Sequence, residues 1–146
     1  YQASAYWLEG LSWVGPSWGE APPLAEPRPG ETAAAALART LEPLLGRLAG
    51  ERDGQTLRVE RRHVGDVVVW LGERAVDWDR PVRLEVDGRL AFSGRLSPDP
   101  ALAAARAAAT MDFESLRFAG IRVSAAGEAT VLTARTLSDP AWRTAR

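Results

Sequence analysis

The chain has 146 residues, a formal net charge of -1 and no cysteine; 46% of its residues are hydrophobic and 25% are charged. This length and composition indicate one globular domain with a core of its own. The near-neutral charge excludes a general nucleic-acid-binding surface, and the missing cysteines exclude disulfides and thiol catalysis. No apolar run reaches the length of about 18 residues that a membrane span needs.

Lysine is absent as well, and all 18 basic residues are arginine. A chain without lysine has no Walker-type phosphate loop and no Schiff-base chemistry. The absence of cysteine also removes zinc sites built on cysteine ligands. We therefore expect no cofactor and no metal ion.

Residues 1–30 predict a short strand followed by an ordered loop. The strand is the aromatic stretch Tyr6, Trp7 and Leu8, and the remainder is rich in proline and glycine, which leaves no room for a long helix or a central strand. A disordered linker rarely carries much aromatic surface, so we expect this loop to pack on the domain. Its apolar members are Leu11, Trp13, Val14 and Trp18.

Residues 31–49 predict the first helix. Thr32 is a suitable N-cap, and an alanine run follows it. Leucines then recur at spacings of four, three and four residues, which places them on one face. Pro43 cannot donate a backbone hydrogen bond, so it is expected to kink or restart the helix. The leucines of this face are Leu37, Leu41, Leu44 and Leu48.

The next segments have the patterns of strands. Residues 55–62 alternate in side-chain character, as a strand with one buried face does. Residues 66–71 contain the run Val67–Leu71, which is apolar throughout and rich in β-branched side chains. This run predicts a central strand buried on both faces.

A hairpin is predicted farther along the chain. Residues 82–87 alternate apolar and charged side chains, and residues 89–96 return as the partner strand. Asp87-Gly88 between them suits a two-residue type I′ turn, because both positions of that turn need a positive φ.

The last third of the chain predicts a helix and further strands. A helix rich in alanine is expected at about residues 100–110, and residues 117–124 resume the alternation of a strand. Thr130–Thr136 is expected to form a last edge strand. From Asp139 onward the chain is polar except for Trp142, and we expect it to fray.

Together these elements predict one α+β domain over residues 1–146, dominated by an antiparallel sheet, sandwich-like and carrying two helices. Its parts are the opening strand and loop (1–30), the first helix (31–49) and a β-rich core (55–137) that includes the second helix.

One catalytic pattern occurs. Residues 15–19 match Gly-x-Ser-x-Gly, the nucleophile elbow of α/β-hydrolases, with Ser17 as the nucleophile. The elbow needs a helix after the serine, whereas Pro22 and Pro23 follow here. A glycine- and proline-rich turn is therefore the favoured interpretation.

Two further candidates have a structural interpretation that we favour. His63 has no nucleophile or orienting partner near it in the sequence, which favours a partly exposed strand-end residue over a general base. Asp77-Trp78-Asp79 resembles part of a calcium loop, but Arg80-Pro81 breaks that pattern, so capping of a turn by the carboxylates is favoured. We predict no catalytic residue.

Six tryptophans are the least ordinary feature of the composition. Trp70 belongs to the apolar run, and the others lie in or beside predicted loops. Exposed tryptophans stack on sugar rings or anchor protein partners, so Trp13, Trp18 and Trp78 are the candidate binding residues. The interpretation that we favour for these loop tryptophans is that they close the end of the sheet, with Trp13 and Trp18 buried against the helix at 31–49.

From Val67 to Val123 the chain resembles a known type of domain. Val67–Leu71 is followed by Ala75–Val82 (AVDWDRPV), by Arg83–Leu96 (RLEVDGRLAFSGRL) and later by Phe118–Val123 (FAGIRV). This order is similar to the small β-rich domain at the C-terminal end of bacterial α/β-hydrolase-like proteins, of the prolyl-oligopeptidase-like and dienelactone-hydrolase-like kinds common in planctomycetes. Tyr6-Trp7-Leu8 resembles the aromatic strand that opens that domain.

The resemblance implies an accessory domain without catalysis of its own, because in those proteins the Ser-Asp-His machinery lies in the preceding hydrolase domain. It implies a hydrolase domain or another protein as the partner, within a parent protein that is a serine hydrolase. The helix at 31–49 and the loop before it look like an insertion relative to the family pattern.

Three functional hypotheses stand at this point. The leading one is a non-catalytic accessory or interaction domain of an α/β-hydrolase-like protein. The second is a stand-alone binding module whose Trp-rich loop holds a carbohydrate or a protein, and the lowest-ranked is a small serine esterase using Ser17. The sequence leaves the ligand, the oligomeric state and the compartment open.

Overall fold

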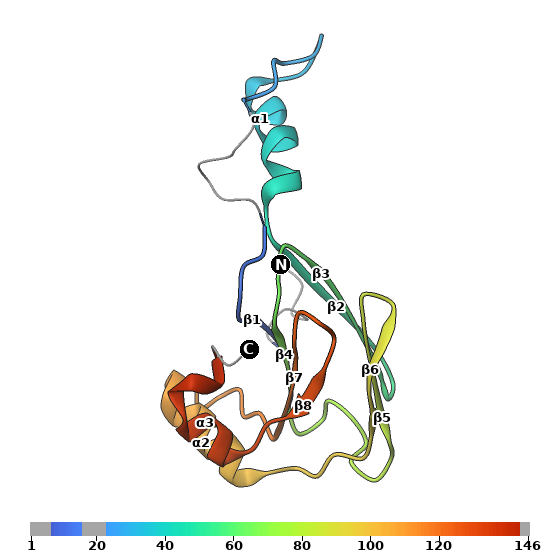
Figure 1. Cartoon of the computed structure of the whole chain (residues 1–146), viewed down its shortest axis with the longest axis vertical. Coiled ribbons are helices and arrows are strands. Elements are labelled where there is room, and N and C mark those ends of the chain that lie inside the picture. The colour runs from blue at the N-terminus through green and yellow to red at the C-terminus, as the bar shows by residue number, and fades with distance from the viewer. Residues whose placement is uncertain (1–6, 16–22, 144–146) are drawn as a thin grey trace.

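Residues 7–15 and 23–143 are described by a computed structural model, in which eight strands form two four-stranded sheets (Figure 1). The first sheet has the order β1-β4-β7-β8, with strands Leu8–Gly10, Val67–Leu71, Ala119–Val123 and Ala129–Val131. The second has the order β2-β3-β5-β6, with strands Arg47–Asp53, Thr56–Arg62, Val82–Val86 and Arg89–Gly94. Within the described residues only β3 and β5 pair in parallel. The predicted α+β, sheet-dominated and sandwich-like fold is confirmed.

The two sheets share one apolar core between their inner faces. β3 contributes Leu57 and Val59, and β5 contributes every second residue, as expected for strands with one buried face. β4 and β7 supply the opposite side of this core, where Val69 and Ile121 are fully buried. Sheet-on-sheet packing therefore provides most of the buried apolar surface.

β4 is buried on both faces, as the run Val67–Leu71 predicts. Its other face packs against the helical layer, where Val68 and Trp70 meet Leu102, Leu132 and Trp142. This layer consists of α2 (Pro100–Thr110), α3 (Ala134–Ser138) and the 3₁₀ helix η4 (Pro140–Arg143).

The predicted hairpin is confirmed. β5 pairs antiparallel with β6, and the turn residues Asp87 and Gly88 have φ angles of 52° and 75°. Both values lie in the left-handed region that a type I′ turn requires. The second helix also begins where expected, with the Asp99 side chain accepting hydrogen bonds from the backbone of Ala101 and Leu102.

The first helix is shorter than predicted. α1 spans Ala33–Leu41, and the 3₁₀ helix η3 (Glu42–Leu44) follows, with Pro43 inside it. The chain then turns extended into β2, so Leu48 packs on the core as a strand residue. The predicted helix was too long because Leu48 fits the helical spacing and equally suits a half-buried strand.

The C-terminal predictions also need correction. The expected strand Thr130–Thr136 stops at Val131, because Thr133 begins α3 with a capping box instead. The prediction that the chain frays from Asp139 is wrong as far as Arg143. The 3₁₀ helix η4 places Trp142 in the helical layer, where only 9% of its surface is exposed. Burial of one large aromatic side chain explains why this polar segment stays packed.

Candidate functional site

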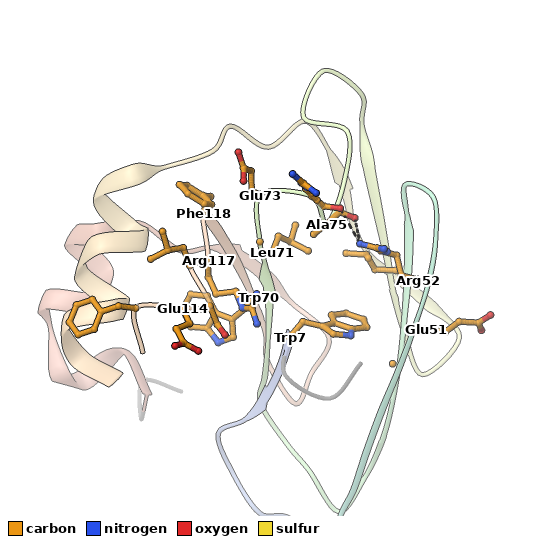
Figure 2. A pocket seen from close by; sticks show the side chains of 17 residues that line it. Trp7, Glu51, Arg52, Trp70, Leu71, Glu73, Ala75, Glu114, Arg117 and Phe118 are labelled. Atoms are coloured by element: carbon orange, nitrogen blue, oxygen red, sulfur yellow. Dashed lines mark hydrogen bonds between the residues drawn. The ribbon is translucent and has the colours of Figure 1, made fainter. Parts of the chain in front are cut away.

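A cleft of about 980 Å³ opens at the edge of the sandwich beside β4. Strand β1 pairs with Val67–Val69 of β4. Among the described residues, no strand continues this pairing along the same edge of β4 to Trp70 and Leu71. β2 and the loop 72–81 form one wall, and the segment 113–118 forms the other (Figure 2). Among the described residues, the cleft thus lies beside the edge of β4 at Trp70 and Leu71.

Trp7 stands between the sheets at this opening (Figure 2). Its ring lies against the backbone of β2 at Gly50, where an added Cβ would sit 2.6 Å from Cζ2 of Trp7. Only glycine leaves room for that approach. The buried side chains of Leu57 and Leu71 line the cleft beneath. An aromatic ring over an apolar floor is therefore built into this end of the sandwich.

Arg52 joins β2 to the loop 72–81. Its Nη1 donates hydrogen bonds to the carbonyl oxygens of Ala75 (2.9 Å) and Arg74 (3.3 Å), drawn in Figure 2. Among the described residues no carboxylate forms an ion pair with Arg52. Carbonyl dipoles hold the guanidinium in place but leave its full positive charge at the cleft.

The opposite wall is ordered by Asp112. Its Oδ1 accepts hydrogen bonds from the backbone N–H groups of Ser115 (3.0 Å) and Glu114 (3.2 Å). These bonds, that to Ser115 foremost, hold the pKa of the Asp112 carboxyl below its usual value. The turn presents Phe113, which is 61% exposed, and Arg117, whose Nη1 would lie 3.1 Å from a Cβ added at Gly72.

Trp70 is held from the helical side. Its Nε1 donates to Oε2 of Glu9 at 2.9 Å, and the guanidinium of Arg106 lies 4.5 Å from the ring centroid. Arg106 also approaches Glu9 at 3.9 Å. A carboxylate, an indole and a guanidinium thus contact one another and hold the Trp70 ring in place beside the cleft.

The cleft has the side chains of a binding surface. Its charges are balanced, with three arginines facing three glutamates, and aromatic rings stand on both walls. The described lining includes no histidine, and its one serine, Ser115, is hydrogen-bonded to Asp112, whose lowered pKa makes its carboxylate a weak base. No group of three or more metal-ligating side chains occurs in the described ranges. The charged members are Glu51, Arg52, Glu73, Arg74, Glu114 and Arg117.

Trp13, a predicted binding residue, is 47% exposed and lies outside this cleft. Its backbone forms an isolated antiparallel bridge with Val64, and its ring lies 5.5 Å from the ring of His63. The ring covers Gly15 and Gly46, where an added Cβ would come within 2.3 and 2.7 Å of it. Burial against the first helix is therefore wrong for Trp13, because the bridge to Val64 directs the ring to the start of β2.

Trp78, another predicted binding residue, does not lie beside Trp13. Trp78 is half-buried against the core, and its Nε1 donates to the carbonyl of Glu73 at 2.8 Å. Its loop is bonded to Gln55, just before β3, whereas Trp13 lies beside His63, just after β3. The seven residues of β3 separate them by roughly 20 Å, so these two do not form one platform. Trp18, like Ser17, lies outside the described residues.

His63 and Asp77 have structural partners. The Nε2 of His63 is 2.7 Å from the carbonyl oxygen of Pro43, and the residue itself has a φ of 57°. Asp77 accepts a hydrogen bond from the backbone of Asp79 at 3.0 Å, which is the expected turn capping. Both side chains stabilise loops beside β3.

The residues of the cleft were not among the predicted site residues. In the sequence, Trp7 indicates only an opening strand, and Arg52 and Phe113 lie in segments without a motif. The available signal was Gly50, which interrupts a strand and so indicates a close approach by another group.

Searches for relatives returned no match: no known family model, no curated protein and no solved structure corresponds to this chain. In the described part of the chain no helix has both the length and the apolar character for a membrane crossing.

Proposed function

We propose that this chain is a non-catalytic interaction domain whose edge cleft binds a segment of a partner protein. The observation that carries the proposal is that both aromatic rings and guanidinium groups line an open cleft of about 980 Å³. Tryptophan and arginine are the side chains that contribute most to protein interfaces, since they combine apolar area with directional hydrogen bonds.

A protein segment fits this cleft better than a strongly charged ligand. Because arginines and glutamates are equal in number along the lining, the cleft offers partners for both signs of charge and attracts neither sign overall. A peptide with an apolar anchor and flanking charged residues matches that arrangement. Trp7 and Phe113 are the rings available to the anchor.

The partner that we propose is an α/β-hydrolase-like domain, and the chain is then its accessory domain. The support is the resemblance of residues 67–123 to the β-rich domain that follows such hydrolases. Catalysis then belongs to the hydrolase domain, as the resemblance implies.

Two measurements test this proposal. The parent reading frame should encode a Gly-x-Ser-x-Gly hydrolase domain upstream of Tyr1, and that domain, expressed separately, should bind the chain in isothermal titration calorimetry. Phe113→Ala and Glu114→Arg should weaken binding by about tenfold or more, because they remove an exposed anchor and reverse a wall charge. Leu90→Ala, on β6 and 52% exposed, is the matched control and should bind normally. A parent frame without a hydrolase, or variants that bind as the unmodified chain does, would contradict the proposal.

A second candidate function is favoured by one observation. Trp13 is half exposed, with its ring packed on Gly15 and Gly46, as a residue that stacks on a sugar ring or on a protein partner would be. If this surface binds the ligand, Trp13→Ala abolishes binding of a carbohydrate panel or of the hydrolase domain, whereas Phe113→Ala leaves binding unchanged.

A further inference from the structure

Strand β2 has a charged residue on its core-facing side. In the register with β3, Gly50 lies opposite Val59 and Arg52 lies opposite Leu57, and both β3 residues are buried between the sheets. Directly opposed residues of neighbouring strands share one face of a sheet, so Gly50 and Arg52 belong to the inner face of β2. Inner-face positions are normally apolar, and a charge among them indicates a function rather than packing.

The Arg52 guanidinium is held in place and keeps its charge. Its Nη1 donates to two carbonyl oxygens of the loop 72–81, and among the described residues no carboxylate pairs with this arginine. The neighbouring Glu51 belongs to the outer face, opposite Arg58 of β3, and Figure 2 shows its carboxylate pointing away from Trp7. A charged group that is already oriented loses little conformational entropy when it binds.

An apolar ring lies beside this charge on the same face. Trp7 covers the inner face of β2 at Gly50, where an added Cβ would come within 2.6 Å of Cζ2 of the ring. Gly50 and Arg52 are two residues apart in an extended strand, which is a separation of about 7 Å. The indole and the guanidinium therefore offer an apolar contact and a positive charge at roughly that spacing along β2.

The other charges of the cleft stand apart from this pair. Glu114 belongs to the opposite wall, and Figure 2 shows the carboxylate of Glu73 pointing out of the cleft. From the opposite wall Arg117 reaches Gly72, directly after β4, where its Nη1 would lie 3.1 Å from an added Cβ. The charge next to Trp7 on the β2 side is therefore positive, although the lining as a whole is balanced.

We infer that Trp7 and Arg52 recognise an extended partner segment that carries an apolar side chain and, two residues away, an aspartate or glutamate. The inference rests on the proposed function and names the sequence pattern that the cleft selects. Residues i and i+2 of an extended segment point to the same side about 7 Å apart, which matches the spacing of the indole and the guanidinium. The guanidinium then pairs with the carboxylate through charge-assisted hydrogen bonds, and the indole packs on the apolar group.

Selection from a random peptide library displayed on phage tests the inference with the full chain. The displayed peptides are joined to the coat protein at their C-terminus, so an acidic preference must come from side chains and not from a terminal carboxylate. Enriched peptides should contain an acidic residue two positions from a leucine, isoleucine or aromatic residue more often than the unselected library does. Selection on Arg52→Gln should lose this acidic preference. Selection on Arg89→Gln, at an exposed arginine of β6 outside the cleft, is the matched control and should keep it.

A double-mutant cycle on one enriched peptide separates recognition by Arg52 from an effect on the loop 72–81. Replacing the acidic residue of the peptide by the corresponding amide should weaken binding to the unmodified chain by about tenfold or more in isothermal titration calorimetry. The same replacement should change binding to Arg52→Gln little, because the carboxylate no longer has its partner there. If Arg52 acts only by holding the loop, the replacement would weaken binding equally in both chains.

The outcomes separate this inference from the proposed function. Enriched peptides without the acidic spacing, or an acid-to-amide effect that is the same in both chains, would overturn the inference while the hydrolase domain still binds. A library from which no peptide is enriched would overturn it as well, because the cleft then selects no segment. A hydrolase domain that does not bind the chain contradicts the proposed partner instead. Unchanged far-ultraviolet circular dichroism and melting temperature show that Arg52→Gln and Arg89→Gln are folded.

Discussion

Trp142 packs edge-on against Trp70, with ring centroids 6.3 Å apart and an interplanar angle of 86°. Arg122 of β7 donates a hydrogen bond to the carbonyl oxygen of Trp142, so both the ring and the backbone of this residue are held. One aromatic contact thereby joins the last helical turn to the central strand and to the tryptophan that lines the cleft.

Trp142→Ala should therefore destabilise the whole domain. Truncating a large buried aromatic side chain typically costs about 3–5 kcal/mol. Urea denaturation followed by circular dichroism measures this loss. Met111→Ala, at a residue that is 75% exposed, is the control and should change stability little. If the two variants unfold alike, the C-terminal segment does not contribute to the core.

Gly50→Ala should disturb the cleft and the core beneath it. The new methyl group would lie 2.6 Å from an atom of Trp7 and 2.7 Å from one of Leu8, and both side chains would have to move. Overpacking of this kind costs about 1–3 kcal/mol, which thermal denaturation detects. Gly72→Ala is the matched control, because its nearest contact is the flexible end of Arg117 at 3.1 Å. Equal stability of the two variants would show that Trp7 does not depend on the space at Gly50.

Helix α1 should lose stability in acid. The side chain of Arg39 and the backbone N–H of Arg28 bind the Glu31 carboxylate and lower its pKa from 4.5 to about 2. A carboxyl group with a lower pKa in the folded state stabilises the fold above its unfolded pKa, and this contribution is lost as pH falls through the folded pKa.

Hydrogen exchange of the α1 amides, corrected for intrinsic rates, should therefore lose protection as the pH falls from 4.5 toward 2. Glu31→Gln should remove this pH dependence and leave the α1 amides less protected over the whole pH range. Protection that stays constant over this range in the unmodified chain would contradict the role of the Glu31–Arg39 pair.

Trp13→Ala should have a smaller effect than the loss of a buried tryptophan. Because 47% of Trp13 is exposed, roughly half of the usual cost, about 1–2 kcal/mol, is expected in a thermal melt. Trp78→Ala, at a half-buried residue of the core edge, is a useful comparison. A melting temperature within about a degree of the parent would show that the Trp13 ring contributes little packing and would move the binding-module hypothesis to first place.

Neither Ser17 nor His63 should support ester hydrolysis by this chain. Nε2 of His63 is occupied by the carbonyl of Pro43 at 2.7 Å, which leaves it poorly placed as a general base for a serine. Turnover of a nitrophenyl ester by the unmodified chain, by Ser17→Ala and by His63→Ala should all equal background. Activity well above background that both substitutions abolish would refute the accessory-domain hypothesis.

Local sequence by itself determined several elements of this protein. The turn at Asp87-Gly88, the N-cap of α2 at Asp99 and the buried strand Val67–Leu71 depend on neighbouring residues alone, through φ preference, capping and side-chain character. For these elements the predicted and observed bounds agree to within a residue or two.

Only the tertiary structure decided where the leucine pattern changes from helix to strand and which aromatic residues meet. Leu48 suits either element, and its place in β2 follows from pairing with Arg61 of β3. Likewise, the cleft lies where both sheets meet, with Trp7, next to β1 of the first sheet, placed against Gly50 of the second. Such contacts join residues far apart in the chain, and their energy depends on sheet packing that no local pattern encodes.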